Sequence, residues 1–225
     1  MIRNYFNGES VELHEILKAR DKRQERQQKM LSSYGNILIC LTLNIAGPVK
    51  YFPMAEKTIK EGIESIKASL ACERIPVMDH KLYLEKTGCE AYFSVDGHPE
   101  KVKRLMVRIE DTFPLGRLLD IDVLTSDGKK MERGHIGMEA RTCFLCSKPA
   151  AQCGRSRTHS LEELIDYTQK TMLDFFLDKF SDKAARLAAR SLLYELSVTP
   201  SPGWLTGQIT EPTKTWTFLH SSTAA

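Results

Sequence analysis

Apolar side chains along this chain follow two different spacings, which divide it into expected helices and strands. Where they recur three or four residues apart, they predict amphipathic helices, and these cover residues 9–33, 53–71, 98–113, 160–180 and 182–197. Short leucine-rich and β-branched runs bounded by turn residues predict strands, and these cover residues 36–50, 74–85, 89–96 and 116–131. Helices and strands mixed in this order indicate an α+β fold with a small, mostly antiparallel sheet.

The first expected helix has an apolar face that turns polar at mid-length. Its apolar positions are Leu13, Ile16, Leu17 and Leu31. Between them the same face carries Arg20, Gln24 and Gln27. Two interpretations fit this pattern: the helix lines a cleft over part of its length, or it leaves the core there.

Composition narrows the class of protein. Of the 225 residues, 42% are apolar and 27% are charged, and the net charge of +3 argues against a dedicated nucleic-acid binder. No apolar run approaches the roughly 20 residues of a membrane helix, and the first ten residues lack the apolar core of a signal peptide. We therefore expect a cytoplasmic protein that binds neither membrane nor nucleic acid.

Two aspartates stand two residues apart in the last expected strand. The strand reads GRLLDIDV over residues 116–123, so Asp120 and Asp122 share one face while their apolar neighbours point to the other. Carboxylates this close repel each other. A magnesium ion between them removes that cost and still accepts substrate phosphates as ligands. Such a site can hold a triphosphate, neutralise departing pyrophosphate and activate an attacking hydroxyl.

The alternative for these aspartates is a surface strand with alternating acids. Three features favour the metal site: the strand is otherwise apolar, Gly116 lets backbone approach a phosphate, and Arg117 offers a fork that matches phosphate oxygens. A glycine followed by an aspartate pair also resembles the nucleotidyltransferase signature, which implies a nucleotidyltransferase-like fold. For the third carboxylate of that signature the candidate is Asp96, at the end of another expected strand.

Three of the six cysteines lie within eleven residues, next to a histidine. The order Cys143-x2-Cys146-x6-Cys153-x5-His159 offers three thiols and an imidazole, and the first pair has the spacing of a zinc knuckle. We expect a structural zinc site here. Cysteines packed in a loop that folds without metal are the alternative. The loop ends at Ser160, which forms a capping box with Glu163 and opens the next helix.

The same region is basic. Between residues 129 and 157 there are seven Lys or Arg side chains and two Glu side chains. Arg155 and Arg157, which adjoin Cys153, are candidates for binding phosphates or an acidic partner. A solvated loop is the alternative for each of them.

Four stretches together resemble one family, the apo-citrate lyase phosphoribosyl-dephospho-CoA transferases, also called citrate lyase holo-acyl-carrier-protein synthases. They are LKARDKRQERQ (17–27), LTLNIAGPVK (41–50), PLGRLLDIDVLTSDG (114–128) and RTCFLCSKPAAQCGRSRTHS (141–160). They occur in the order of the family, and the resemblance spans about residues 13–175.

The resemblance implies a reaction and its site residues. A serine of the acyl carrier protein, the gamma subunit of citrate lyase, attacks the triphosphate of 2'-(5''-triphosphoribosyl)-3'-dephospho-CoA; a phosphodiester forms and pyrophosphate leaves. The similar transferase of malonate decarboxylase also relies on an aspartate pair, which maps onto Asp120 and Asp122. The other matching stretches supply candidate pocket residues, namely Arg20, Asp21, Arg23, Gln27, Asn44 and Lys50.

Two other functions compete with this one. A nucleotidyltransferase with a different acceptor would carry the same aspartate pair. A non-enzymatic zinc-knuckle adaptor would bind protein or RNA and would keep its function without Asp120 or Asp122. The low net charge and the lack of aromatic residues interleaved near the knuckle count against RNA.

The end of the chain resembles the start of a different enzyme. We expect the transferase domain over residues 1–180 and a remnant of a triphosphoribosyl-dephospho-CoA synthase over 181–203, where RLAARSLLYELSVTPSPG (186–203) carries the resemblance. Residues 204–225 have no apolar period and are expected to be a disordered tail. Codons that encode 204–218, read from their third nucleotide, can give VDRANNGAHKDMDF, which continues the synthase pattern. A shifted reading frame explains the tail, and a natural variable tail is the alternative.

Overall fold

The computed structural model describes residues 5–179 of the chain. Its helices are α1 (Leu13–Tyr34), α2 (Pro53–Cys72), α3 (Pro99–Thr112), α4 (Ala150–Ser156) and α5 (Leu161–Asp178). Its strands are β1 (Ile37–Leu43), β2 (Val77–Glu85), β3 (Gly88–Val95) and β4 (Leu119–Leu124). The α+β prediction is confirmed. The expected helix at 182–197 and the segments beyond residue 180 lie outside the described residues.

The four strands form one antiparallel sheet in the order β2-β3-β1-β4. Strand β1 lies in the middle, and its Thr42 pairs with Glu90 of β3 on one side and with Asp120 of β4 on the other. Since paired residues point to the same face, Glu90, Thr42 and Asp120 form a row across the sheet. One step along, Cys40 pairs with Tyr92 and Asp122 in the same way.

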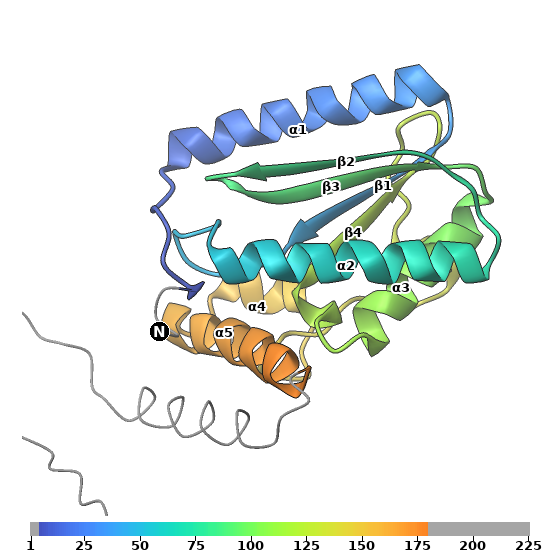
Figure 1. The fold of residues 1–225 in the computed structure, drawn as a ribbon. Helices are drawn as coiled ribbons and strands as arrows, with labels where there is room; N and C mark the ends of the chain where they lie inside the picture. The colour runs from blue at the N-terminus through green and yellow to red at the C-terminus, as the bar shows by residue number, and fades with distance from the viewer. Residues whose placement is uncertain (1–4, 180–225) are drawn as a thin grey trace, which may run out of the picture. The chain divides into compact units, whose positions relative to one another are not determined.

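One face of the sheet is apolar and packs against α2 and α3 (Figure 1). Helix α2 begins with Pro53, whose fixed φ suits the first helical position. At Gly62 of α2 an added Cβ would lie 3.1 Å from a methyl carbon of Leu119 and 3.2 Å from one of Leu41. Glycine therefore lets the helix approach β1 and β4 closely. The fully buried side chains on this side include Ile39, Leu41, Ile59, Ile66, Phe93, Met106 and Leu119.

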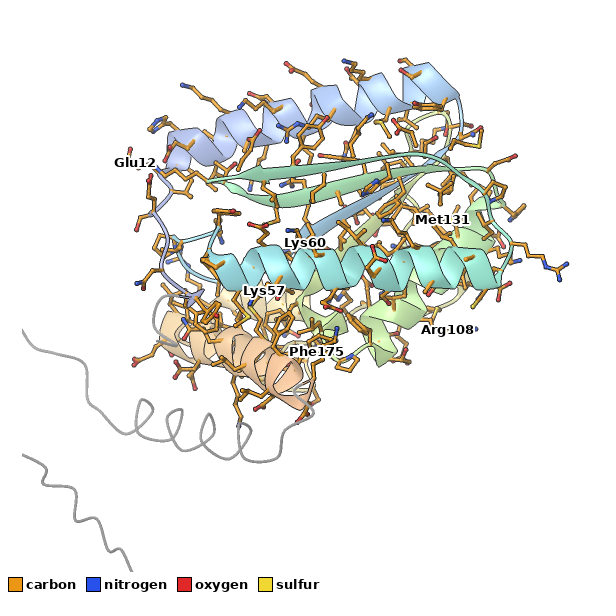
Figure 2. All side chains as sticks on the ribbon, in the orientation of Figure 1. Glu12, Lys57, Lys60, Arg108, Met131 and Phe175 are labelled. Atoms are coloured by element: carbon orange, nitrogen blue, oxygen red, sulfur yellow. The ribbon has the colours of Figure 1, made fainter. Side chains whose placement is uncertain are left out.

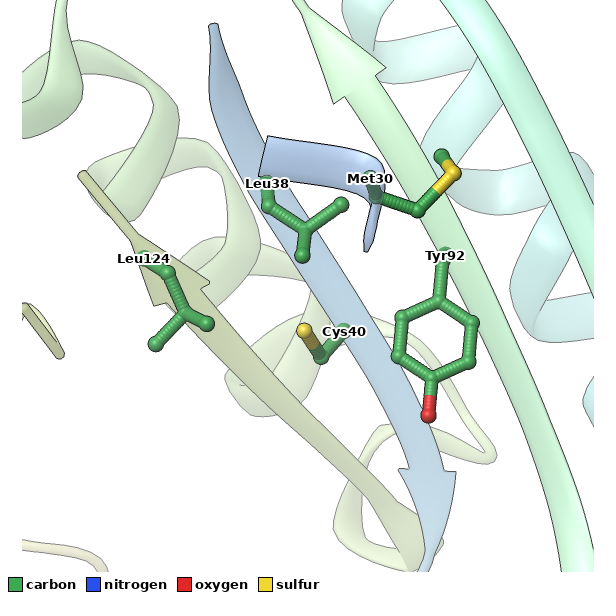
Figure 3. Packing of buried hydrophobic residues seen from close by; sticks show 5 residues of the cluster. All are labelled: Met30, Leu38, Cys40, Tyr92 and Leu124. Atoms are coloured by element: carbon green, nitrogen blue, oxygen red, sulfur yellow. The ribbon is translucent and has the colours of Figure 1, made fainter. Parts of the chain in front are cut away.

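The opposite face carries α1, and it mixes apolar and charged contacts. Met30 of α1 joins Leu38, Cys40, Tyr92 and Leu124 of the sheet in a small buried cluster (Figure 3). Burying each of the larger side chains contributes about 1.5–3 kcal/mol relative to exposure. This cluster anchors the C-terminal half of α1 over the sheet.

The apolar stripe predicted for α1 is wrong in part. Leu13 and Leu17 are 75% and 48% exposed, whereas the buried residues of the helix are Ala19 and Met30. The side of α1 that faces the sheet carries Arg23 and Arg26, because the sheet beneath presents the buried carboxylate of Glu90. An ion-paired contact therefore replaces part of the apolar stripe that the pattern predicted.

Side chains of α3 occupy the free edge of β4. Buried Lys103 donates through Nζ to the carbonyl oxygen of Ile121 (3.1 Å), and Glu110 Oε1 accepts from the backbone N–H of Ile121 (2.9 Å). An edge strand otherwise leaves such groups without protein partners. These two contacts fix the backbone between Asp120 and Asp122.

Two expected boundaries were too long, and one helix was missed. The strand predicted at 36–50 ends at Leu43, and the strand predicted at 116–131 is β4 preceded by a 3-10 turn at Gly116–Leu118. Helix α4 lies in the 141–159 region, where the sequence shows no period, because seven residues are too few to display one. The capping box of Ser160 and Glu163 at the start of α5 is confirmed.

Aromatic contacts hold α5. Phe175 of α5 meets Phe113 edge to face with ring centroids 5.5 Å apart, and Tyr167 stacks on Phe144 at 5.1 Å (Figure 2). Such pairs contribute about 0.5–1.5 kcal/mol each beyond their buried area. Within residues 5–179 no helix combines the length and apolarity needed to cross a membrane.

Candidate active site

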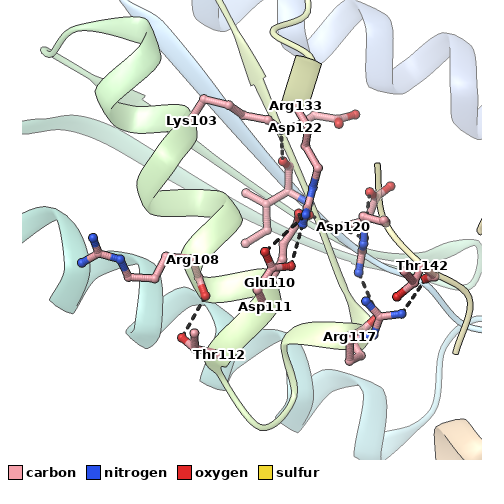
Figure 4. A network of polar contacts seen from close by, with 12 residues as sticks. Lys103, Arg108, Glu110, Asp111, Thr112, Arg117, Asp120, Asp122, Arg133 and Thr142 are labelled. Atoms are coloured by element: carbon pink, nitrogen blue, oxygen red, sulfur yellow. Dashed lines mark hydrogen bonds and ion pairs between the residues drawn. The ribbon is translucent and has the colours of Figure 1, made fainter. Parts of the chain in front are cut away.

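The aspartate pair lies on β4 as its alternation predicted. Leu119, Ile121 and Val123 are buried, while the side chains of Asp120 and Asp122 are 52% and 32% exposed on the opposite face. Figure 4 shows the two carboxylates beside the charged residues of α3 and of the loop that follows β4. Both carboxylates are held by a rigid strand and remain reachable from solvent.

The two aspartates have unequal cationic partners. Lys130 Nζ lies 2.8 Å from Asp122 Oδ1, a close ion pair, whereas Arg141 Nη1 lies 3.5 Å from Asp120 Oδ1. Burial and then the neighbouring charge of Asp122 raise the pKa of Asp120, and Arg141 offsets this only in part. Asp120 is thus a carboxylate whose charge the protein leaves incompletely compensated.

A buried acid orients the arginines near the pair. Glu110 accepts from Arg133 Nη2 at 2.6 Å and lies 3.5 Å from Arg141 Nη1, and Arg133 also pairs with Asp111 at 2.9 Å (Figure 4). Arg141 in turn donates to the carbonyl oxygen of Arg117 at 3.0 Å. Since these guanidinium groups are fixed by several contacts, their charge is presented at the aspartates without further ordering.

A cavity of about 420 Å³ opens beside Asp120, and we call it the basic cavity. Its charged lining residues are Arg20, Arg23, Lys50, Asp120 and Arg141, and its polar ones include Thr42, Asn44 and Thr142. Arg20 makes no ion pair or side-chain hydrogen bond within the described part of the chain. Burial lowers the pKa of Lys50, whose ammonium donates to the carbonyl oxygen of Ile45. Four cations around one carboxylate suit a polyanionic ligand.

A second cavity of about 340 Å³ lies along the edge of β4, and we call it the edge cavity. It shares Asp120 and Arg141 with the basic cavity and adds Asp122 and Lys130. The remaining charged lining residues are Lys103, Glu110, Glu132 and Arg133. Asp120 and Arg141 therefore stand where two hollows meet.

The thiols and the imidazole predicted as zinc ligands lie together. Ligand atoms of Cys143, Cys146, Cys153 and His159 are all within 4.8 Å of one another. The aspartate pair and this cluster are thus two separate groups that could bind a metal ion.

Comparison with known proteins identifies the family. The sequence profile of the apo-citrate lyase phosphoribosyl-dephospho-CoA transferases matches residues 11–175. The chain belongs to this family. It is 36% identical over 176 residues to the probable transferase of this name from Streptococcus pyogenes serotype M18 (strain MGAS8232), a match that covers 76% of this chain and 91% of that protein. It is 31% identical over 156 residues to the transferase of Citrobacter koseri, covering 69% and 85%.

A longer relative matches more of the chain. Protein CitXG of Haemophilus influenzae is 29% identical over 196 residues, which are 87% of this chain and 42% of that protein. The chain therefore spans less than half the length of that relative. As a member of the transferase family, the chain is an enzyme of the nucleotidyltransferase type.

All four stretches that carried the family resemblance contribute to the basic cavity. The stretch 17–27 supplies Arg20 and Arg23, 41–50 supplies Asn44 and Lys50, 114–128 supplies Asp120, and 141–160 supplies Arg141 with its neighbours. Segments far apart in the sequence of this transferase thus converge on one hollow.

Other predicted site residues lie elsewhere. Gln27 lies behind the cavity and donates to Cys40 Sγ at 3.5 Å. A Cβ on Gly116 would lie 2.3 Å from the carbonyl oxygen of Ile109, so it is the backbone of α3, rather than a ligand, that requires glycine here. Arg117 donates to the carbonyl oxygens of Thr142 (2.5 Å) and Cys143 (2.9 Å). None of these three residues lines either of the two cavities described above.

The remaining basic candidates and the third carboxylate also differ from expectation. Arg155 on α4 and Arg157 just after it are exposed and outside both cavities. Asp96 follows the end of β3 that pairs with the start of β1 at Ile37, whereas Asp120 pairs with Thr42 near the other end. The choice of Asp96 is therefore wrong, because the strand register places it far along the sheet from the pair.

Sequence reasoning missed the residues that surround the pair. Arg141 and Lys130 were counted only as part of a basic region, and Glu110 was an unremarked position on a helix. A signal for Lys130 does exist: the turn at Gly128 folds the chain back so that Lys130 bridges to Leu124, next to Asp122. Nothing local marks Glu110 or Arg141, whose roles depend on long-range contacts.

Proposed function

We propose that this chain transfers a 2'-(5''-phosphoribosyl)-3'-dephospho-CoA group from its triphosphoribosyl precursor to a serine of the citrate lyase acyl carrier protein, releasing pyrophosphate. One observation carries the proposal: four separated family stretches converge on a basic cavity with Asp120 in its wall. In the reaction the serine oxygen bonds to the phosphorus attached to the ribose, and the bond from that phosphorus to the pyrophosphate oxygen breaks.

Asp120 and Asp122 have the donor set for a magnesium ion. Two carboxylates share one face of a strand, and their mutual repulsion raises the pKa of Asp120. When bound, the ion supplies a positive charge that steadies the triphosphate and the leaving pyrophosphate. Lys130 and Arg141 lie at the edges of the pair and would move toward ligand phosphates as the aspartates take up the cation.

Cationic side chains of the basic cavity bind the precursor in this proposal. Arg20 is the first candidate because its guanidinium is free of protein partners in the described residues. Arg23 is already tied to Glu90 at 2.7 Å, so it contributes positive potential and a fixed wall rather than a mobile clamp. Asn44 and Lys50 line the same wall. Gln27, Arg117, Arg155 and Arg157 would act from outside the cavity, through positioning or partner contacts.

The acceptor serine approaches from the edge cavity. That hollow reaches Asp120 and Arg141 from the other side and is lined by acids as well as bases. Donor and acceptor would then meet at Asp120 from two directions, which suits an in-line displacement. The protein partner is the acyl carrier subunit, and we expect the reaction to take place in the cytoplasm.

The decisive experiment incubates the purified chain with apo acyl carrier subunit and the triphosphoribosyl precursor in magnesium buffer. Mass spectrometry should show the acyl carrier serine gaining the prosthetic group, with one pyrophosphate released per transfer. An apo acyl carrier protein from another system tests the competing acceptor. Modification of that protein instead of the citrate lyase subunit would overturn the proposed acceptor but keep the chemistry.

The same assay separates an enzyme from a zinc-knuckle adaptor. An adaptor would bind its partner equally well with Asp120→Asn, whereas the transferase would bind the acyl carrier protein and fail to modify it. Retained transfer in both aspartate variants would refute the proposed site.

We also propose that residues 181–203 are the start of a synthase segment and that 204–225 arise from a shifted reading frame. The match to Protein CitXG supports this, because it extends over 196 residues where the transferase profile covers 11–175. Sequencing the gene tests it. Restoring one nucleotide near the codon of Gly203 should open a continuous synthase reading frame, and the chain as given should lack synthase activity.

A further inference from the structure

The cluster of Cys143, Cys146, Cys153 and His159 is arranged like the ligand shell of a tetrahedral metal ion. The Sγ atoms of Cys146 and Cys153 lie 3.5 Å apart, and Nε2 of His159 lies 3.4 Å from Cys146 Sγ. A zinc ion with Zn–S bonds of about 2.3 Å and a Zn–N bond of about 2.0 Å would hold such atoms roughly 3.5–3.8 Å apart at tetrahedral angles. The spacing found here is that of ligands around a common centre.

The backbone around Cys143 forms the turn that such a site needs. The N–H of Cys143 donates to the carbonyl of Lys148 at 2.7 Å, and the N–H of Ala150 donates to the carbonyl of Arg141 at 2.8 Å, so the segment is a short hairpin. The backbone N–H groups of Leu145 and Cys146 hydrogen-bond to the sulfur of Cys143. Donors aimed at a sulfur stabilise it as a thiolate ligand and orient it.

A disulfide does not account for the cluster. Sulfurs bonded to each other lie about 2.05 Å apart, whereas Cys146 and Cys153 are free thiols at 3.5 Å. A disulfide would also leave Cys143 and His159 without a role, although both belong to the same group of converging atoms. A four-ligand metal site uses every member.

The four ligands tie together segments that otherwise share few contacts. Cys143 and Cys146 come from the hairpin, Cys153 from α4, and His159 from the residue before the N-cap of α5. One ion would therefore replace the apolar core that a loop region of this length lacks.

The hairpin also forms one wall of the basic cavity. Thr142 and Phe144 line that cavity, and Phe144 stacks on Tyr167 of α5. Arg117, directly before β4, donates to the carbonyl oxygens of Thr142 and Cys143. The position of the wall next to Asp120 thus depends on the fold of the cysteine cluster.

We propose that Cys143, Cys146, Cys153 and His159 bind one zinc ion, and that this structural ion holds the hairpin wall of the basic cavity in place. Closed coordination by three thiolates and one imidazole leaves no open position for a substrate. The ion therefore acts on the wall rather than on the reacting atoms. Its effect on precursor binding rests on the proposed function, whereas its presence does not.

Metal analysis of the full chain, purified without chelators, tests the site directly. We expect about one zinc per chain. Replacement by cobalt should give the intense visible bands of tetrahedral thiolate coordination. Cys153→Ser and His159→Ala should each lower metal content well below one per chain, whereas Cys72→Ser, at an exposed thiol at the end of α2, should leave it unchanged.

Chelation tests the role of the ion in the wall. Removing the metal from the unmodified chain should lower the melting temperature, and adding zinc back should restore it. In the transfer assay, His159→Ala should raise the KM for the precursor about tenfold or more with a smaller change in kcat. A folded, metal-free wild-type protein whose melting is indifferent to chelator would overturn the proposal. Metal content can be present while transfer fails, so the two proposals fail independently.

Discussion

Glu90 and Asp120 occupy the same row of the sheet, on either side of Thr42, yet their surroundings are opposite. The side chain of Glu90 is 8% exposed and accepts from Arg23 at 2.7 and 2.9 Å, from Arg26 at 3.1 Å and from the Tyr92 hydroxyl at 2.5 Å. Asp120 is half exposed, and its one ion pair, to Arg141, spans 3.5 Å.

The difference separates a structural carboxylate from a functional one. The oxygens of Glu90 are satisfied within the protein, and its charge fixes α1 to the sheet through two arginines. The oxygens of Asp120 are left for a ligand, and the nearby Asp122 keeps its charge in need of a cation. A buried, fully paired acid stabilises the fold, whereas an incompletely paired acid beside a basic cavity marks the reaction centre.

The largest effect should come from neutralising the aspartate pair. Asp120→Asn and Asp122→Asn should each lower the transfer rate on the order of 10³-fold or more, because each loses a charged metal ligand. Rates with acyl carrier subunit and precursor measure this. Asp127→Asn, the same change in the turn after β4, is the control and should transfer normally. Near-normal turnover in either pair variant would remove the aspartates from the mechanism.

Glu90→Gln should show the opposite behaviour. It leaves Arg23 and Arg26 without their shared carboxylate, so unfolding in urea should need about 3 kcal/mol less free energy. Asp120→Asn should leave the midpoint almost unchanged. Glu64→Gln, at an exposed helix pair, is the stability control and should stay within about 0.5 kcal/mol. Equal destabilisation by Glu90→Gln and Asp120→Asn would contradict the distinction between the two acids.

Arg20 and Arg23 extend the comparison to the cations. Arg20→Ala should raise the KM for the precursor about tenfold, equivalent to 1.4 kcal/mol, with melting unchanged, because its guanidinium has no protein partner to lose in the described residues. Arg23→Ala should lower the melting temperature as well. Lys18→Ala, an exposed cation on α1 outside the cavity, controls for general charge. Equal KM values for the Arg20 and Lys18 variants would exclude Arg20 from binding.

The smallest effect concerns pH. Because the pKa of Asp120 is raised in the folded chain, the folded state binds this proton more tightly than the unfolded state, and ionised Asp120 costs stability at neutral pH. Asp120→Asn should therefore be more stable than wild type at pH 7, by less than about 1 kcal/mol since the group is half exposed. The gap should shrink as pH falls through the pKa of Asp120. Urea titrations at several pH values measure it, and a gap that widens on acidification would show the opposite shift.

Much of the site could be predicted because strand alternation and family stretches are local patterns. Asp120 and Asp122 share a face since side chains two apart on any strand do so, and Arg20, Asn44 and Lys50 were found through the stretches that resemble the family. Where the pattern was read as a simple core stripe it was wrong: Leu13 and Leu17 are exposed, because α1 meets the sheet through arginines.

The amino-acid sequence by itself determined the mixed α and β class, the aspartate pair, the start of α5 at Ser160, and the family. Only the tertiary structure decided which carboxylates are paired internally and which are open. The register of β1 puts Glu90 and Asp120 in one row and carries Asp96 away from it. Contacts between residues tens of positions apart, such as Arg141 with Asp120 and Glu110 with Ile121, leave no local pattern, because they arise when separate elements pack together.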